Sequence, residues 1–352
     1  MAKNLKIMGS IEKLPISSYI EYTYLSDNAT LELYIKYPYE NMQNNKADFE
    51  AITFAVWSVN PDIKIVLKYK HWEWGNQIPP IYDKKEMERE QKEEKTEGNI
   101  YHYMRFLYRA YKMKTLYGNF SIAPQNDSEV GLFGDLFENA KTSNNLYMTT
   151  SDSESSVKNS EDELTENNLE KWFVLKSHAV NGIHSEVQYL RKLTGVCELY
   201  DQFPCGLFYD ANTPSEEKRI FNTGYFDLWG TDENNDICLF ELKKPGNKGL
   251  GIISELFFYS CLAKDFKDIG KPNDKKKVRG YNVFLNANKK IKAYFLVPEF
   301  HSFIDGHIDS IINVMNKRTD GVEYGYIKFN YENISKDDSM INIKREWENF
   351  KY

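Results

Sequence analysis

The sequence lacks most of the short motifs that identify a chemistry by themselves. Its six histidines are scattered, with no HExxH, and its four cysteines include no CxxC pair. These absences argue against the common zinc sites and against a disulfide framework, so we expect reduced thiols and a cytoplasmic protein. A P-loop ending in GK[ST] and a GxGxxG loop are missing as well.

Long apolar runs are also missing. Nowhere does the chain hold the run of about 18 apolar residues that a membrane-spanning helix needs. Its first residues, MAKNLKIMGSIEKLP, do not resemble a signal peptide. We therefore expect a protein that is neither exported nor membrane-spanning. Its net charge of -7 argues against a surface that is basic everywhere, so any nucleic-acid contact must use a local basic patch.

The chain has 352 residues and 41% hydrophobic content, enough to bury a core and to form about two domains. A segment rich in Ser, Asn and acidic residues, 149–170, predicts a linker or a long exposed loop. It separates an N-terminal α+β domain, 1–148, from a C-terminal domain, 171–352. The N-terminal domain is left without an assigned function, with recognition, regulation and oligomerisation open.

Two segments of the N-terminal half alternate apolar and polar residues with period two, which predicts half-buried strands at 31–37 and 62–74. The charged run 83–95 predicts a solvated helix. The following helical pattern, 99–114, places Arg105 and Arg109 in a basic stripe. That stripe either follows a phosphate backbone or faces solvent.

The C-terminal half alternates helices and strands. This order predicts a mixed sheet with helices packed against its faces, an α/β (α+β) fold. The expected helices are 184–193, 250–266 and 303–316, and the expected strands are 207–209, 224–229, 237–243, 291–298 and 322–329.

The most informative stretch is GYFDLWGTDENNDICLFELKKP, residues 224–245. Its centre is dense in turn-forming residues and predicts a hairpin in which Asp227 and Glu241 face one another. Directly opposed side chains lie about 5 Å apart at Cβ, and two carboxylates that close repel each other. A divalent cation offsets the repulsion, and oxygen ligands favour Mg²⁺ or Mn²⁺ over Zn²⁺.

Lys243 lies two residues beyond Glu241 and therefore projects on the same face of the strand. Two carboxylates, a metal ion and an ammonium suit phosphodiester hydrolysis, because the metal activates water and the lysine stabilises charge on the phosphate. The alternative is an ordinary hairpin whose acids pair with lysines and whose Lys243 is solvated. A third acid, Glu186 in IHSEVQYLRKL, lies beside the apolar stripe of a helix, where it either reaches the sheet edge or stays on the surface.

This pattern resembles the PD-(D/E)XK nuclease superfamily, with a helical Glu186, a strand Asp227 and the strand motif Glu241-Leu242-Lys243. The resemblance covers about 171–330. It implies a restriction-endonuclease-like core, a Mg²⁺ site held by the acids, and a DNA endonuclease, most often in restriction or antiviral defence. RNA stays open, because the phosphate is common to both nucleic acids.

Many members of that superfamily carry QxxxY on the following helix, and this chain has Glu255 and Tyr259 at that spacing. Glu255 is either an accessory metal or water ligand or a helix-surface residue, and Tyr259 fits a core position. Lys244 and Lys248 are candidate contacts for a nucleic-acid backbone. Since one nuclease site cuts one strand, duplex cleavage favours a homo-oligomer or a partner protein. The competing interpretation is a nuclease-fold binding or scaffold protein without turnover.

Overall fold

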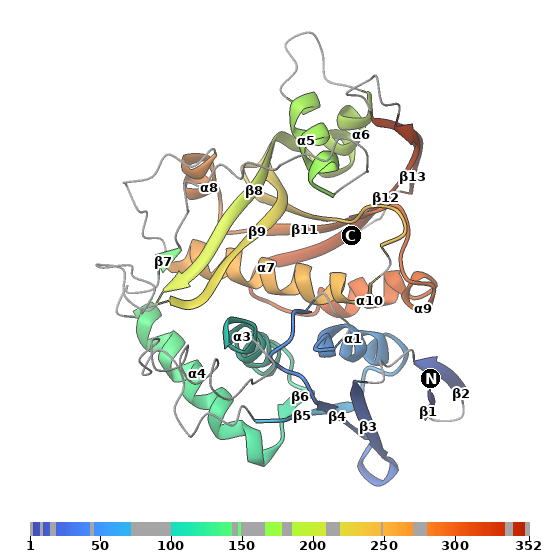
Figure 1. The fold of residues 1–352 in the computed structure, drawn as a ribbon, viewed down its shortest axis with the longest axis vertical. Coiled ribbons are helices and arrows are strands. Elements are labelled where there is room, and N and C mark those ends of the chain that lie inside the picture. The colour runs from blue at the N-terminus through green and yellow to red at the C-terminus, as the bar shows by residue number, and fades with distance from the viewer. Residues whose placement is uncertain are drawn as a thin grey trace, which may run out of the picture.

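The computed structural model describes residues 3–7, 10–14, 19–42, 46–71, 100–142, 147–148, 166–177, 185–208, 219–247, 249–269, 280–334 and 341–348. These residues form a mixed α/β protein with a four-stranded sheet in the N-terminal half and a seven-stranded sheet in the C-terminal half. Helices lie against both sheets (Figure 1). The predicted fold class is confirmed.

The N-terminal sheet has the strand order β3-β4-β5-β6, in which β4, β5 and β6 are parallel and β3 is an antiparallel edge strand. Leu31, Leu33 and Ile35 of β4 are completely buried, as the period-two alternation predicts. The elements are β1 (Lys3–Ile7), β2 (Ser10–Leu14), β3 (Ile20–Leu25), η1 (Ser26–Asn28), β4 (Thr30–Ile35), α1 (Phe49–Val59), β5 (Lys64–Tyr69), α3 (Ile100–Leu116), β6 (Phe120–Ile122) and α4 (Pro124–Thr142).

The C-terminal sheet has the strand order β13-β12-β11-β10-β9-β8-β7. Its central strands β10, β11 and β12 are parallel, and the flanking pairs are antiparallel. The elements are β7 (Tyr147–Met148), α5 (Glu166–Ser177), α6 (Ser185–Thr194), β8 (Val196–Phe208), β9 (Arg219–Asp232), β10 (Ile237–Leu242), α7 (Gly251–Ile269), α8 (Tyr281–Asn286), β11 (Ile291–Val297), α9 (Ser302–Asp305), α10 (Ile308–Met315), β12 (Val322–Ile334) and β13 (Ile341–Glu348).

The two halves share one hydrophobic cluster. Helices α5 and α6 cover one face of the C-terminal sheet, and α7 and α10 lie between that sheet and helices α1 and α3 of the N-terminal half (Figure 1). The rings of Phe54 and Phe257 are 5.8 Å apart between centroids, and those of Tyr108 and Phe258 are 5.6 Å apart. The apolar core therefore runs without interruption from one sheet to the other.

The predicted linker at 149–170 is wrong at its C-terminal end. Helix α5 begins at Glu166, and its residue Leu169 is completely buried against the C-terminal sheet. Leu169 and Phe173 are spaced one helical turn apart and give this helix an apolar side. The sequence-based prediction missed the helix because the residues around Leu169 are mostly polar. On the other side of the segment, Tyr147 pairs with Phe208, so a strand from the N-terminal side completes the C-terminal sheet.

Strand β8 begins at Val196, well before the short strand that the sequence predicts at 207–209. Pro204 and Gly206 give this segment the composition of a turn, yet it pairs with β9 along most of its length. Gln202 has a left-handed φ of 44° and lies opposite Asp227 in the register. The strand bends there. Strand β13 was not predicted, and the helix predicted at 83–95 lies outside the described residues.

Two observations bear on the predicted compartment. All four cysteines are free; Cys197 is exposed, and Cys205, Cys238 and Cys261 are buried. Among the residues described, none of the helices has the length and apolar character that crossing a membrane requires.

Candidate active site

The hairpin of β9 and β10 has the predicted register. Its antiparallel pairs run from Ile237 opposite Thr231 to Phe240 opposite Leu228. Asp227 and Glu241 are the next residues of the two strands. The turn is held by the Asp232 carboxylate, which accepts the backbone N–H groups of Asn234 and Asp236, each at 2.9 Å. The hairpin prediction is confirmed, and it brings the two acids to the same end of the strand pair.

Glu241 and Lys243 lie on one face and touch. The Lys243 Nζ donates to Glu241 Oε1 at 2.7 Å. Glu241 is 3% exposed and Lys243 is 6% exposed, so the interpretation of Lys243 as a solvated strand residue is wrong. A charged pair this deep is stable only when its hydrogen-bonding capacity is met by neighbours.

Asp227 lies at the bend opposite Gln202. Its Oδ2 accepts the backbone N–H of Leu242 at 2.8 Å, which ties the carboxylate to the end of β10. Asp227 keeps some contact with solvent, whereas Glu241 is buried. The hairpin therefore brings one half-buried acid and one buried acid to the same end of the strand pair.

Glu255 is a second acidic partner of Lys243. It projects from α7 and is 2% exposed, and its Oε2 lies 3.0 Å from the Lys243 Nζ. The interpretation of Glu255 as a helix-surface residue is therefore wrong. The ammonium group is held between Glu241 on the strand and Glu255 on the helix.

Two acids of α5 reach the same site, and neither was predicted, because both fall in the segment assigned as a linker. Glu166 Oε2 lies 4.0 Å from the Lys243 Nζ, while its Oε1 accepts the Asn247 amide at 2.8 Å. Glu170 is 4% exposed and accepts the Gln202 amide at 3.0 Å. The available signal was the i, i+4 spacing of these acids beside the apolar stripe of the helix.

The site holds several carboxyl groups and one ammonium group, and the pKa values of Asp227 and Glu170 are raised. Burial raises the pKa of Asp227 to about 6, with Lys243 opposing the shift and Glu255 adding to it. Burial and then the charge of Asp227 raise the pKa of Glu170 to about 8. Glu170 is therefore largely protonated at neutral pH unless a cation binds nearby.

The pKa values of Glu241 and Lys243, the central pair of the site, are shifted as well. Burial raises the pKa of Glu241 well above its usual range, and the charges of Asp227 and Glu255 add to this effect. For Lys243, burial opposes the charged form, but the neighbouring carboxylates of Glu241 and Glu255 prevail and raise its pKa well above the usual value. The amine is therefore an ammonium at neutral pH.

The donor set suits a hard cation. Within the described residues, acidic, histidine and cysteine side chains nowhere form a set of three or more arranged to hold a metal ion. Asp227 and Glu241 nevertheless supply two carboxylates, and Mg²⁺ often takes only one or two from a protein, with water and phosphate as its other ligands. Burial is the main cause of their raised pKa values, and the charges of neighbouring carboxylates add to it. A bound cation would stabilise the ionised form of both groups.

Three predicted residues stay predictions. Glu186 is the second residue of α6, but its side chain lies outside the described part of the structure, as does the whole of Lys248. The backbone N–H of Lys244 lies 3.4 Å from Glu166 Oε1, and its side chain is half-buried beside the site. A role for Lys244 in binding a phosphate backbone fits this place.

The predicted basic stripe on α3 is wrong. Arg109 is 1% exposed and donates to Glu50 Oε2 at 2.7 Å and to the Ala47 carbonyl at 3.0 Å. Arg105 is 8% exposed, with its guanidinium 5.6 Å from the centre of the Phe258 ring. Arg109 is buried inside the N-terminal half, and Arg105 lies against α7 of the C-terminal half, so Arg109 cannot touch nucleic acid in this structure.

Tyr259 is a core residue, as its sequence position favours. Its ring meets Phe226 edge-on, with 5.5 Å between centroids. A Cβ at Gly224 would lie 2.9 Å from the Tyr259 hydroxyl and 3.3 Å from the Arg105 Nη2. Gly224 is thus needed for the close approach of α3, α7 and β9.

Comparisons with protein-family models, with curated proteins and with solved structures find no match to this chain. The assignment of a function therefore depends on the chemistry of the site.

Proposed function

We propose that the chain is a metal-dependent nuclease that hydrolyses phosphodiester bonds, with DNA as its substrate. The observation that carries the proposal is the cluster of acids from one hairpin, α5 and α7 that lies around the buried ammonium group of Lys243 and the Asp227 carboxylate beside it. The acids are Asp227, Glu241, Glu255, Glu166 and Glu170. So many carboxyl groups in one place favour cation binding, and the pattern around Asp227 and Glu241 resembles the PD-(D/E)XK superfamily.

Asp227 and Glu241 would hold Mg²⁺ or Mn²⁺, with Glu186 as a further predicted ligand. When bound, the metal ion supplies a Lewis acid for the phosphate and lowers the pKa of a water molecule. The raised pKa of Lys243 argues against a role as general base. As an ammonium, it donates hydrogen bonds to phosphate oxygens and stabilises the charge that develops on them.

Glu255 and Glu166 pair with Lys243 and favour its charged form. Glu255 is 3.0 Å from the Lys243 Nζ and keeps the amine charged and oriented, so we assign it a positioning role. Lys244 and Lys248, beside the site in sequence, are proposed contacts for the nucleic-acid backbone. Cleavage of a duplex would engage a second copy or a partner protein, and the proposed setting is cytoplasmic restriction or antiviral defence.

The test is an incubation with plasmid, linear duplex, single-stranded DNA and RNA in Mg²⁺ or Mn²⁺. We expect wild-type protein to cleave DNA, and Asp227→Asn and Lys243→Met to be inactive. Lys292→Met is the matched control, because Lys292 also pairs with hairpin carboxylates, but at the turn end near Asp232 and Asp236. It should lose stability and keep activity.

The substrate panel separates the alternatives. Cleavage of RNA alone would replace DNA by RNA and keep the site. Retained cleavage in both Asp227→Asn and Lys243→Met would overturn the assignment of the site. Binding of nucleic acid without cleavage by wild-type protein under every metal condition would favour a nuclease-fold binding protein.

A further inference from the structure

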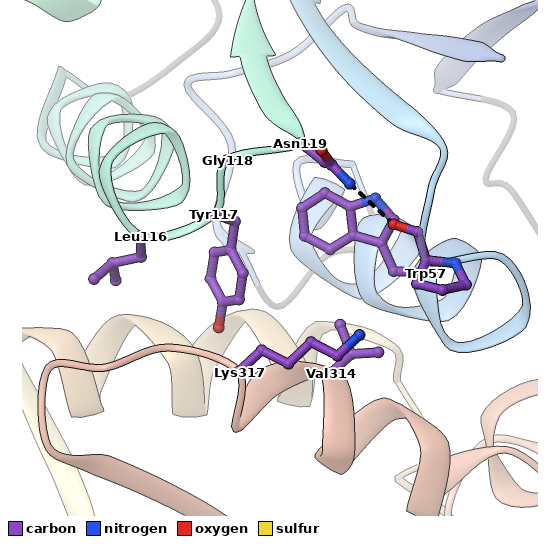
Figure 2. A pocket seen from close by; sticks show the side chains of 8 residues that line it. Trp57, Leu116, Tyr117, Gly118, Asn119, Val314 and Lys317 are labelled. Carbon is purple, nitrogen blue, oxygen red and sulfur yellow. Dashed lines mark hydrogen bonds between the residues drawn. The ribbon is translucent and has the colours of Figure 1, made fainter.

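A pocket lies where the two halves of the chain meet, lined from three directions. Its volume is about 260 Å³. Trp57 comes from α1, Leu116 and Tyr117 from the end of α3, and Val314 and Lys317 from the end of α10 (Figure 2). The residues from α1 and α3 belong to the N-terminal half and those from α10 to the C-terminal half. None of the acids around Lys243 lines this pocket.

The walls of the pocket are more apolar than polar, because three lining side chains use their polar atoms in hydrogen bonds to the backbone. The Trp57 Nε1 donates to the Ile63 carbonyl at 2.8 Å, and the Tyr117 hydroxyl donates to the Met315 carbonyl at 3.0 Å. The Asn119 amide donates to the Pro61 carbonyl at 3.0 Å. Trp57 and Tyr117 are 4% and 7% exposed, and the small area of each ring that is open to the pocket is carbon. The rings of Trp57 and Tyr117 lie 5.6 Å apart between centroids with a tilt of 39°.

Lys317 gives the pocket its charge. Its side chain is exposed and runs along the pocket from the end of α10 (Figure 2). No acidic side chain of the described residues pairs with it. A cation without a partner beside aromatic carbon faces complements a ligand that has an apolar ring system and a negative charge.

We propose that this pocket binds a small organic anion with a flat aromatic body and a single acidic group, the body against Trp57 and Tyr117 and the acid on Lys317. The volume fits a ligand of one or two fused rings. Because the walls come from both halves, a bound ligand adds contacts across their junction and stabilises the folded chain. The proposal does not depend on the nuclease function.

The test uses 2-naphthoate as the probe and 2-naphthamide as its uncharged isostere, with the full-length protein. We expect 2-naphthoate to bind by isothermal titration calorimetry and to raise the melting temperature. Lys317→Gln should weaken naphthoate binding about tenfold, as loss of a charged hydrogen bond does. It should leave the weaker naphthamide binding unchanged. Lys289→Gln, which removes another exposed lysine outside the pocket, is the matched control.

A second pair of variants tests the location. Leu116→Trp narrows the pocket and should abolish binding of both probes. Leu132→Trp makes the same change at an exposed position of α4 and should leave binding intact. The proposal is overturned if wild-type protein does not bind naphthoate at millimolar concentration. It is also overturned if Lys317→Gln and Leu116→Trp bind naphthoate as wild type does.

Discussion

The Glu50 carboxylate on α1 accepts a hydrogen bond from the Ser254 hydroxyl on α7 at 2.8 Å. The same Oε2 atom accepts the Arg109 Nη1 at 2.7 Å, and Glu50 is completely buried. Ser254 directly precedes Glu255, the residue that holds Lys243. A buried charge of the N-terminal half thus fixes the part of α7 that carries an acid of the candidate site.

We expect Ser254→Ala to lower the free energy of unfolding by about 1.5–3 kcal/mol, the range for a hydrogen bond to a charged group. Ser260→Ala is the control on the same helix. Its hydroxyl is also buried but bonds to neutral partners, the Phe257 carbonyl at 3.0 Å and the Tyr324 hydroxyl at 2.7 Å. Urea unfolding followed by circular dichroism measures both. Equal losses in the two variants would contradict the special role of the charged link.

Arg109→Met should have a larger effect that depends on pH. It leaves Glu50 buried without its cation, which costs about 3–5 kcal/mol. Burial already raises the pKa of Glu50 to about 7, although Arg109 opposes the shift. Without Arg109 the pKa rises further, so the folded state takes up a proton as pH falls and regains stability.

Urea unfolding of Arg109→Met at about pH 8 and about pH 5.5 measures this dependence. We expect the loss relative to wild type to be smaller at the lower pH. The double variant Glu50→Gln, Arg109→Met should show a smaller pH dependence, because Glu50 no longer titrates. What remains comes from Asp48, whose pKa burial raises to about 6 while Arg109 opposes the shift. A loss that is the same at both pH values in Arg109→Met would exclude Glu50 as its cause.

A fragment ending at residue 148 should not fold by itself. Phe54 and Tyr108 pack against α7 residues Phe257 and Phe258, so the fragment would expose the apolar side of α1 and α3. Circular dichroism and proton NMR of the fragment measure this. A cooperative unfolding transition of the isolated fragment would show instead that the N-terminal half is an independent domain.

The hairpin was predictable because the residues that determine it are close together in the sequence. The turn composition of 231–236 fixes the register, and the period of two then places Asp227, Glu241 and Lys243. The regular alternation in β4 and β5 is local in the same way. These elements follow from short-range rules that a single sequence carries.

The missed features depend on contacts between distant segments. Arg109 looks like a surface residue until Glu50, far away in the sequence, is placed beside it. The polar composition before α5 concealed Glu166 and Glu170, whose role depends on Lys243 and Gln202 across the fold. Local pattern and composition do not report such pairings, which arise only from the packing of α1, α3, α5 and the sheet.

Lys243→Met should separate metal binding from catalysis. The ammonium competes with a metal ion for the carboxylates of Glu241 and Glu255, so its removal should tighten Mn²⁺ binding in calorimetry. The same variant should not cleave DNA, because the donor to the phosphate is lost. Asp227→Asn should lose both properties. Weaker Mn²⁺ binding by Lys243→Met would show that the lysine supports the metal site instead of competing with it.

Metal binding should strengthen as pH rises. The pKa values of Asp227, about 6, and Glu170, about 8, are raised in the folded protein, so these groups must release protons when a cation binds. We expect Mn²⁺ affinity to increase from about pH 5.5 to about pH 8. Glu170→Gln removes one of the groups that must release a proton, so the Mn²⁺ affinity of this variant should depend less steeply on pH. Affinity that is constant over this interval would mean that neither carboxyl group gives up a proton to the metal ion.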